Sequence, residues 1–217
     1  MIIITGASSG VGLHIAKLYQ DAGIRVVNIS RRPSEYADVN ISVSLAEQSG
    51  IDQAIAEIVN IDEPITALIN VAGMWSAQEL RDLEYDEIKR VMAINSDGLM
   101  YLTAQLHDRI MQDGADILNV ISFAGTVGSK GFALYSASKW AQRGFTKSLQ
   151  DLYVNTPTRV VSFCPGGMNT ELFAKAGNTD LDTSNWMQPE DIAGLIKYIL
   201  DLPKNIEVRE IVLQKKS

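Results

Sequence analysis

The chain has 217 residues, 46% hydrophobic and 21% charged, which is ordinary for a globular protein with a substantial core. Its formal net charge of -7 argues against a nucleic-acid partner, because phosphates attract basic surfaces. Two histidines and one cysteine are too few for a zinc site built from several such ligands, so we expect no metal. The lone Cys164 cannot form an internal disulfide, which favours a reducing compartment.

The first residues, Met1 to Gly6, place three isoleucines before a glycine-rich turn. They lack the basic region and the longer apolar run of a secretory signal. No stretch reaches the roughly 18 uninterrupted apolar residues that a membrane helix needs. We therefore expect a cytoplasmic protein without a membrane partner.

Short runs of β-branched and apolar residues predict seven strands along the chain. They cover residues 2–4, 26–29, 41–43, 67–69, 117–121, 160–163 and 211–213. Several show little polar alternation, as expected for strands that are covered on both faces.

Segments with helical periodicity lie between these strands. They cover residues 13–22, 50–59, 85–92, 98–111, 135–153 and 189–200. Gly23 suits the end of the first helix, and Pro189 followed by two acidic residues suits the start of the last one. The alternation predicts an α/β fold, a single doubly wound Rossmann-type domain over residues 1–217. Its parallel sheet would have about seven strands, with helices on both faces.

The segment from Met168 to Gln188 has weak periodicity, and a loop of about 20 residues is unusual in a compact domain. Its apolar members are Leu172, Phe173, Leu181, Trp186 and Met187. Such side chains favour a lid over a disordered segment, so residues 168–188 are the candidate substrate loop.

A glycine-rich turn, Thr5-Gly6-Ala7-Ser8-Ser9-Gly10-Val11-Gly12, follows the first predicted strand and opens the first helix. Glycines let the backbone approach a pyrophosphate, and a helix N-terminus adds N–H donors and partial positive charge. The spacing is G-x-x-x-G-x-G, so a tight structural turn is the alternative interpretation. The strand–turn–helix context favours dinucleotide binding. The residues predicted to contribute are Gly6, Ser8, Ser9, Gly10, Val11 and Gly12.

The stretch from Tyr135 to Lys139 places a tyrosine and a lysine one helical turn apart, on the same face. An ammonium group near a phenol is expected to lower the tyrosine pKa from about 10. Such a tyrosine can exchange a proton with an alcohol or carbonyl oxygen near neutral pH. Ser122 ends the preceding strand, where its hydroxyl can donate to the same oxygen.

Six motifs stand in order along nearly the whole chain. They are Thr5 to Gly12, Asn70-Val71-Ala72-Gly73, Asn95, Ser122, Tyr135-x-x-x-Lys139 and Pro165-Gly166-Gly167-Met168-Asn169-Thr170. Together they resemble the short-chain dehydrogenase/reductase family. Two positions depart from its pattern. Val71 replaces the second Asn of the family's Asn-Asn-Ala-Gly, and Ser44 stands where many relatives carry an Asp that contacts adenine.

The resemblance implies a role for each matched position. Tyr135 would be the general acid/base, and Ser122 would hydrogen-bond the substrate oxygen. Lys139 would bind the nicotinamide ribose and depress the Tyr135 pKa, while Asn95 would hold a water that relays protons to Lys139. Thr170 would bind the nicotinamide carboxamide. The other residues expected at the cofactor are Ser44, Asn70, Ala72, Gly73, Pro165, Gly166 and Met168, with Tyr135 and Lys139 themselves.

Ser30 ends the second predicted strand, where NAD-specific relatives carry an acidic residue for the ribose 2′-hydroxyl. The following Arg31 and Arg32 can pair with a 2′-phosphate. The alternative is a solvated basic pair at a strand end. We predict that the cofactor is NADP(H).

These features predict an NADP(H)-dependent oxidoreductase, a carbonyl reductase that interconverts a carbonyl and an alcohol by hydride transfer. Two alternatives stay open: a non-catalytic redox sensor that binds the dinucleotide, and a sugar-nucleotide epimerase or dehydratase. The sensor class usually loses the tyrosine or lysine, and the second class needs an added C-terminal substrate domain. The candidate wall residues favour a small apolar or aromatic substrate. They are Met74, Trp75, Phe123, Phe132, Gly166, Gly167, Leu172, Phe173 and Trp186.

In similar proteins, the helices that match residues 98–111 and 135–153 pair across a two-fold axis. Trp140 follows Lys139 directly and so points about 100° away from it on the helix. It belongs either to the core or to an interface. We favour the interface and expect a homo-oligomer, a dimer or a tetramer.

Overall fold

The computed structural model describes residues 1–76, 78–128, 130–177 and 180–216. In this part of the chain, one parallel sheet has the strand order β3-β2-β1-β4-β5-β6-β7. The strands are β1 (Ile2–Thr5), β2 (Val26–Ser30), β3 (Val39–Ser42), β4 (Ala67–Asn70), β5 (Asp116–Val120), β6 (Val160–Pro165) and β7 (Glu210–Leu213). The predicted α/β fold with a seven-stranded parallel sheet is confirmed.

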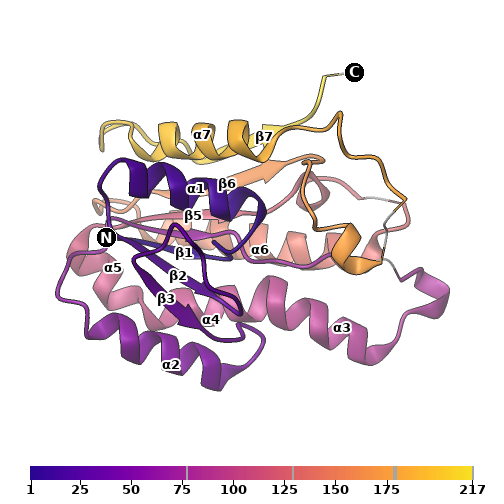
Figure 1. Ribbon diagram of the computed structural model, residues 1–217, viewed down its shortest axis with the longest axis horizontal. Coiled ribbons are helices and arrows are strands. Elements are labelled where there is room, and N and C mark those ends of the chain that lie inside the picture. The colour runs from indigo at the N-terminus through magenta and orange to yellow at the C-terminus, as the bar shows by residue number, and fades with distance from the viewer. Residues whose placement is uncertain (77, 129, 178–179, 217) are drawn as a thin grey trace.

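Helices cover both faces of the sheet (Figure 1). On one face lie α1 (Gly10–Asp21) and α7 (Pro189–Leu200). On the other lie α2 (Gln48–Val59), α4 (Gly98–Gln105), α5 (His107–Asp113) and α6 (Ala133–Leu152). Successive residues of β1 alternate between the two: Ile2 and Ile4 pack with α1 and α7, and Ile3 packs with the other layer. Because both faces are buried, the strands carry the continuous apolar runs that identified them.

The helix predicted over residues 98–111 is in fact two helices, α4 and α5, which meet at Leu106. Leu106 has φ -91° and ψ 0°, and its side chain is buried in the core together with Ile110. The bend therefore lets both apolar side chains face the sheet. A further departure is a π-helical turn, Ala93–Asp97, between α3 (Tyr85–Met92) and α4. Such turns are frequent at functional sites, and hydrophobic spacing did not indicate this one.

The strand order reverses direction between β1 and β4, which are neighbours although β2 and β3 separate them in the chain. In open parallel sheets, ligands bind beyond the carboxyl ends of the strands at such a switch point. The glycine-rich turn follows β1 there, and residues 71–76 follow β4. The fold therefore brings two of the six motifs together.

The predicted substrate loop, 168–188, is anchored at its base by a parallel bridge between Met168 and Met187. It contains one short 3-10 helix, Ala174–Ala176. Asn178 and Thr179 lie outside the described residues. The remainder has little regular structure, as expected, and its role as a lid stays a prediction.

Candidate functional site

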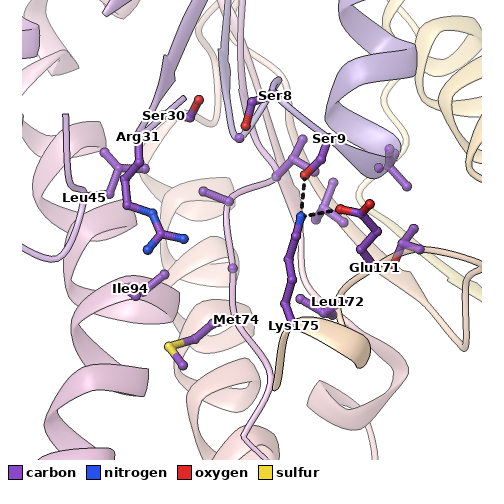
Figure 2. A pocket seen from close by; sticks show the side chains of 18 of the residues that line it. Ser8, Ser9, Ser30, Arg31, Leu45, Met74, Ile94, Glu171, Leu172 and Lys175 are labelled. Atoms are coloured by element: carbon purple, nitrogen blue, oxygen red, sulfur yellow. Dashed lines mark hydrogen bonds and ion pairs between the residues drawn. The ribbon is translucent and has the colours of Figure 1, made fainter. Parts of the chain in front are cut away.

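A cavity of about 670 Å³ opens beyond the carboxyl ends of β1, β2, β4 and β5 (Figure 2). Its volume lies within the range of about 300–1,000 Å³ that is common for ligand pockets. Most of the predicted site residues line it. They are Gly6, Ser8, Ser9, Gly10, Val11, Ser30, Arg31, Arg32, Ser44, Ala72, Gly73, Tyr135, Lys139, Met168 and Thr170.

The glycine-rich turn is packed too closely for side chains at two of its positions. A Cβ on Gly12 would lie 2.4 Å from the Gly6 carbonyl oxygen. Gly6 has φ +77°, and a Cβ there would lie 3.0 Å from the Cα of Ala72. The turn thus lies directly against the loop after β4. The first turn of α1 contains no acidic residue, and the side chain of Ser9 makes no capping hydrogen bond. An open, positive helix end of this kind suits the diphosphate of a dinucleotide.

Ser30 and the two arginines form the end of the cavity beside β2. The Ser30 hydroxyl donates to the Arg32 carbonyl oxygen at 2.6 Å, which shapes the turn after the strand. Figure 2 shows the Arg31 side chain extending from this turn toward Ile94. Position 30, at the end of β2, carries no carboxylate. An anionic group bound there would therefore face the guanidinium groups of Arg31 and Arg32 and no acidic side chain from that position.

Tyr135 and Lys139 lie on α6 at the opposite end of the cavity, and both are almost completely buried. Lys139 Nζ lies 5.7 Å from the centre of the Tyr135 ring. The ammonium group donates to Gln142 Oε1 at 2.8 Å and to the Val120 carbonyl oxygen at 3.4 Å. Ser122 shares a hydrogen bond with Tyr135. The Tyr135 phenol, the Ser122 hydroxyl and the Lys139 ammonium group therefore lie close together, as the sequence predicted.

Burial controls the protonation of this pair. It raises the pKa of Tyr135 to about 12, and the hydrogen bond with Ser122 offsets only part of that shift. Burial also lowers the pKa of Lys139 to about 7. The expected lowering of the Tyr135 pKa by Lys139 is therefore not found. A lysine whose own charged form is disfavoured by burial gives little support to a neighbouring phenolate.

Asn95 projects from the π-helical turn and joins two other elements. Its Oδ1 accepts from the Met74 amide at 2.8 Å, and its Nδ2 donates to the Met74 carbonyl oxygen and to Ser138 Oγ, both at 3.0 Å. A Cβ on Gly73 would lie 3.4 Å from Asn95 Oδ1 and 3.5 Å from Lys139 Nζ. Asn95 thus ties the loop after β4 to the helix that carries Lys139. Its role in a water relay stays a prediction.

Six predicted site residues do not line the cavity. They are Gly12, Asn70, Asn95, Ser122, Pro165 and Gly166. Asn70 points along the sheet instead, where its Nδ2 donates to Asn119 Oδ1 at 2.9 Å. Asn95 and Ser122 lie beside the cavity. Each is hydrogen-bonded to a residue that lines it, Asn95 to Met74 and Ser122 to Tyr135.

An aromatic cluster covers the phenol ring of Tyr135. The Trp75 ring lies 4.6 Å from the rings of both Tyr135 and Phe132, and 4.7 Å from that of Phe173. Phe173 in turn contacts Trp186 at 5.2 Å. Trp75 also lines a second cavity of about 540 Å³, which shares six lining residues with the first: Arg31, Gly73, Met74, Ile94, Leu172 and Lys175. Trp75, Phe132, Phe173 and Trp186, four aromatic residues among the predicted wall residues, therefore lie next to or near Tyr135.

Residues 1–181 match the family model for short chain dehydrogenases. The chain belongs to this family. An uncharacterized oxidoreductase of Staphylococcus saprophyticus is 28% identical and is matched over 98% of this chain and 95% of its own length. These findings confirm the resemblance that the six motifs indicated.

Solved structures show the same fold. The closed form of a serine dehydrogenase complexed with NADP+ has a TM-score of 0.89 at 21% identity, over 99% of this chain and 95% of that chain. An alcohol dehydrogenase from the archaeon Thermococcus sibiricus, complexed with 5-hydroxy-NADP, has a TM-score of 0.85 at 20% identity, over 98% and 95%. At identities of 20–21%, these structures establish a shared fold with this short chain dehydrogenase and nothing more.

The residues at the site that were not singled out from the sequence include Gln142, Glu171 and Lys175. Gln142 lies one turn after Lys139, so its position on α6 could have indicated the contact. Glu171 and Lys175 are four residues apart, which signals an ion pair, and the structure has one at 2.8 Å. Nothing local in the sequence indicates that Lys175 also reaches Ser9, which lies 166 residues away.

No group of three or more His, Cys, Asp or Glu side chains among the described residues could hold a metal ion. None of the helices in the described ranges is both long and apolar enough to cross a membrane.

Proposed function

We propose that this short chain dehydrogenase is an NADP(H)-dependent oxidoreductase that interconverts a carbonyl and an alcohol on a small apolar or aromatic molecule. The observation that carries the proposal is that Tyr135 and Lys139 line the same cavity as the glycine-rich turn, with Ser122 beside the cavity and hydrogen-bonded to Tyr135. A redox sensor would need no proton donor such as Tyr135 and no hydroxyl such as that of Ser122 at the substrate oxygen. Their assembly therefore favours the enzyme.

When bound, the nicotinamide would supply or accept the hydride at its C4 atom. The chain's own residues would position the substrate and move the proton. Ser122 Oγ and the Tyr135 hydroxyl, joined by a hydrogen bond, would both face the substrate oxygen. In the direction of reduction, neutral Tyr135 donates its proton to that oxygen as negative charge develops there. A pKa of about 12 keeps the phenol protonated near neutral pH, which suits this role.

Charged Lys139 would lie next to the phenolate that remains after proton donation, and its pKa of about 7 means that only part of the lysine is charged near neutral pH. Its ammonium group is held by Gln142 on one side and lies next to Gly73, in the loop that Asn95 fixes, on the other. Water exclusion would come from the aromatic cluster of Trp75, Phe132, Phe173 and Trp186. The same cluster favours a substrate with an apolar or aromatic body, because such a group gains most from leaving water there.

The preference for NADP(H) over NAD(H) rests on Ser30, Arg31 and Arg32, which line the cavity at the end of β2. The adenine would lie near Ser44, which lines the same end. Assembly as a dimer or tetramer and a cytoplasmic location stay predictions.

The test is Tyr135→Phe, assayed by the change in 340 nm absorbance of NADPH with a panel of aromatic aldehydes and ketones. Phenylalanine keeps the packing against Trp75 and removes only the hydroxyl. We expect kcat to fall by about 10²- to 10⁴-fold, with cofactor affinity nearly unchanged. Tyr153→Phe is the matched control, since Tyr153 follows α6 and bonds His107, away from the cavity. Near-normal turnover by Tyr135→Phe would contradict the proposed acid/base.

A further inference from the structure

Lys175 joins the substrate loop to the glycine-rich turn across the larger cavity. Its side chain leaves the short helix Ala174–Ala176, and its Nζ lies 3.2 Å from Ser9 Oγ and 2.8 Å from a carboxylate oxygen of Glu171 (Figure 2). Lys175 and Glu171 both line the cavity. The contact links the predicted substrate loop to the N-terminus of α1.

Four cationic side chains line this cavity in the described part of the chain: Arg31, Arg32, Lys139 and Lys175. The arginines lie at the end of β2, and Lys139 lies beside Tyr135. Lys175 is the cation that is hydrogen-bonded to the glycine-rich turn. A diphosphate at the N-terminus of α1 would carry two negative charges to within reach of its Nζ.

We propose that Lys175 is a diphosphate ligand, which exchanges its contact with Ser9 for a phosphate oxygen and so fastens residues 170–176 over the bound dinucleotide. The inference rests on the proposed cofactor and adds a residue to its site. Ser9 is a neutral partner for an ammonium group, whereas a phosphate oxygen gives a charge-assisted hydrogen bond. The exchange is therefore favourable.

The same fastening would position the aromatic cluster. Leu172 and Phe173 lie between Thr170 and Lys175 in the chain, and both pack against the buried group of Trp75 and Tyr135. At the other end of the segment, Thr170 Cγ2 lies 3.4 Å from where a Cβ on Gly10 would be. If the loop is held at Lys175, Leu172 and Phe173 are kept in contact with the buried group that contains Tyr135. Substrate binding would then depend on prior binding of the dinucleotide.

Glu171 must be considered in any test of Lys175, because its carboxylate pairs with Lys175 and also lines the cavity. Lys175→Met should weaken NADPH binding both by losing the phosphate contact and by leaving the Glu171 charge near the diphosphate. The double variant Glu171→Gln/Lys175→Met removes that repulsion and keeps the loss of the contact. We expect about 10- to 100-fold weaker NADPH binding in the double variant, the range for a hydrogen bond to a charged group.

The experiment measures Kd by NADPH fluorescence and by calorimetry, with NADPH and with adenosine 2′-monophosphate, which lacks the diphosphate. The variants should weaken NADPH binding and leave the binding of adenosine 2′-monophosphate unchanged. Lys17→Met is the matched control. Lys17 forms an i,i+4 ion pair with Asp21 on α1, and its side chain is 46% exposed against 44% for Lys175. Lys175→Arg should retain most of the affinity.

Limited proteolysis gives a second readout that needs no turnover. NADPH should protect residues 170–177 in the wild-type protein and fail to protect them in Lys175→Met. NADPH affinity restored to the wild-type value in the double variant would overturn the inference, since Lys175 would then only neutralise Glu171. Wild-type protein that binds no nicotinamide dinucleotide would overturn the proposed function itself.

Discussion

Lys139 donates a hydrogen bond to Oε1 of Gln142 at 2.8 Å, one turn further along α6 and out of contact with solvent. The Nε2 group of Gln142 is buried and has no hydrogen-bond partner within the described residues. The amide is thus held by Lys139 and by packing. We infer that Gln142 is a positioning residue, which holds the ammonium group at the distance from Tyr135 that the structure shows.

Gln142→Leu should therefore change how activity depends on pH. Loss of the acceptor disfavours the protonated lysine, so the Lys139 pKa should fall further below about 7. Less of the lysine is then charged at neutral pH, and kcat should drop by about 10- to 100-fold there. Part of the loss should be recovered as the pH is lowered toward 6. Gln142→Glu should shift the pH profile the other way, because a carboxylate favours the charged lysine.

The control is Gln150→Leu on the same helix. Gln150 is also buried, and it donates to the carbonyl oxygens of Val160 and Arg209, away from the cavity. Its loss should lower stability and leave the pH profile in place. Identical pH profiles for wild type and Gln142→Leu would reject the positioning role.

Much of the fold could be predicted because it depends on local patterns. β1 was found from three isoleucines that are buried on both faces, and α7 was found from Pro189 and the acidic residues after it. The break at Leu106 was missed because it results from packing: Leu106 and Ile110 both turn toward a core built by distant strands. The π-helical turn at Asn95 likewise depends on contacts with Met74 and Ser138, from other parts of the chain.

The site could be predicted in its residue types and only partly in its chemistry. The one-turn spacing of Tyr135 and Lys139 follows from helix geometry alone. Their pKa shifts depend on burial, which for Tyr135 comes from Trp75 and the substrate loop and which no local pattern reveals. The contact between Lys175 and Ser9 was beyond prediction for the same reason, since the two residues come from opposite ends of the chain.

Removal of the buried Asp116 carboxylate should strongly destabilise the protein. Its side chain is 4% exposed, and it pairs with Arg159 and Lys204, each at 2.7 Å. Asp116→Ala leaves the buried Arg159 guanidinium without its counter-charge, so the free energy of unfolding in urea should fall by about 3 kcal/mol. Asp151→Ala is the comparison. Asp151 pairs with Arg209 but is 84% exposed, so its loss should change stability by less than about 1 kcal/mol. Equal effects of the two substitutions would contradict this ranking.

Trp140 is 46% exposed, so of the two interpretations from the sequence the core is wrong and the interface stays a prediction. Its Nε1 donates to the Val127 carbonyl oxygen at 3.4 Å, and the Arg143 guanidinium lies 5.5 Å from the centre of its ring. Trp140→Glu should shift the assembly to a monomer in size-exclusion chromatography with light scattering, because a charge would be buried at the contact. Val59→Glu, at an exposed apolar position on α2, should leave the assembly intact. A monomeric wild-type protein at micromolar concentration would exclude the interface.

The preference for NADP(H) should depend on Ser30 and Arg31. An aspartate at position 30 would repel a 2′-phosphate, whereas Arg31 extends over the cavity with paired N–H donors (Figure 2). A charge-assisted contact of about 1.5–3 kcal/mol corresponds to roughly 10- to 150-fold in kcat/KM. The double substitution Ser30→Asp/Arg31→Leu should therefore reverse the preference, by added repulsion as well as by lost attraction.

Ser30→Thr separates the charge effect from the local structure of the turn. Threonine keeps the hydroxyl that donates to the Arg32 carbonyl oxygen, so the preference for NADP(H) should persist. Arg32→Leu should have a smaller effect than Arg31→Leu, because Arg31 directly follows the position that discriminates between the cofactors. The measurement is kcat/KM for NADPH and NADH at saturating carbonyl substrate. A wild-type ratio near one, or one that favours NADH, would mean that the arginine pair is only a solvated strand end.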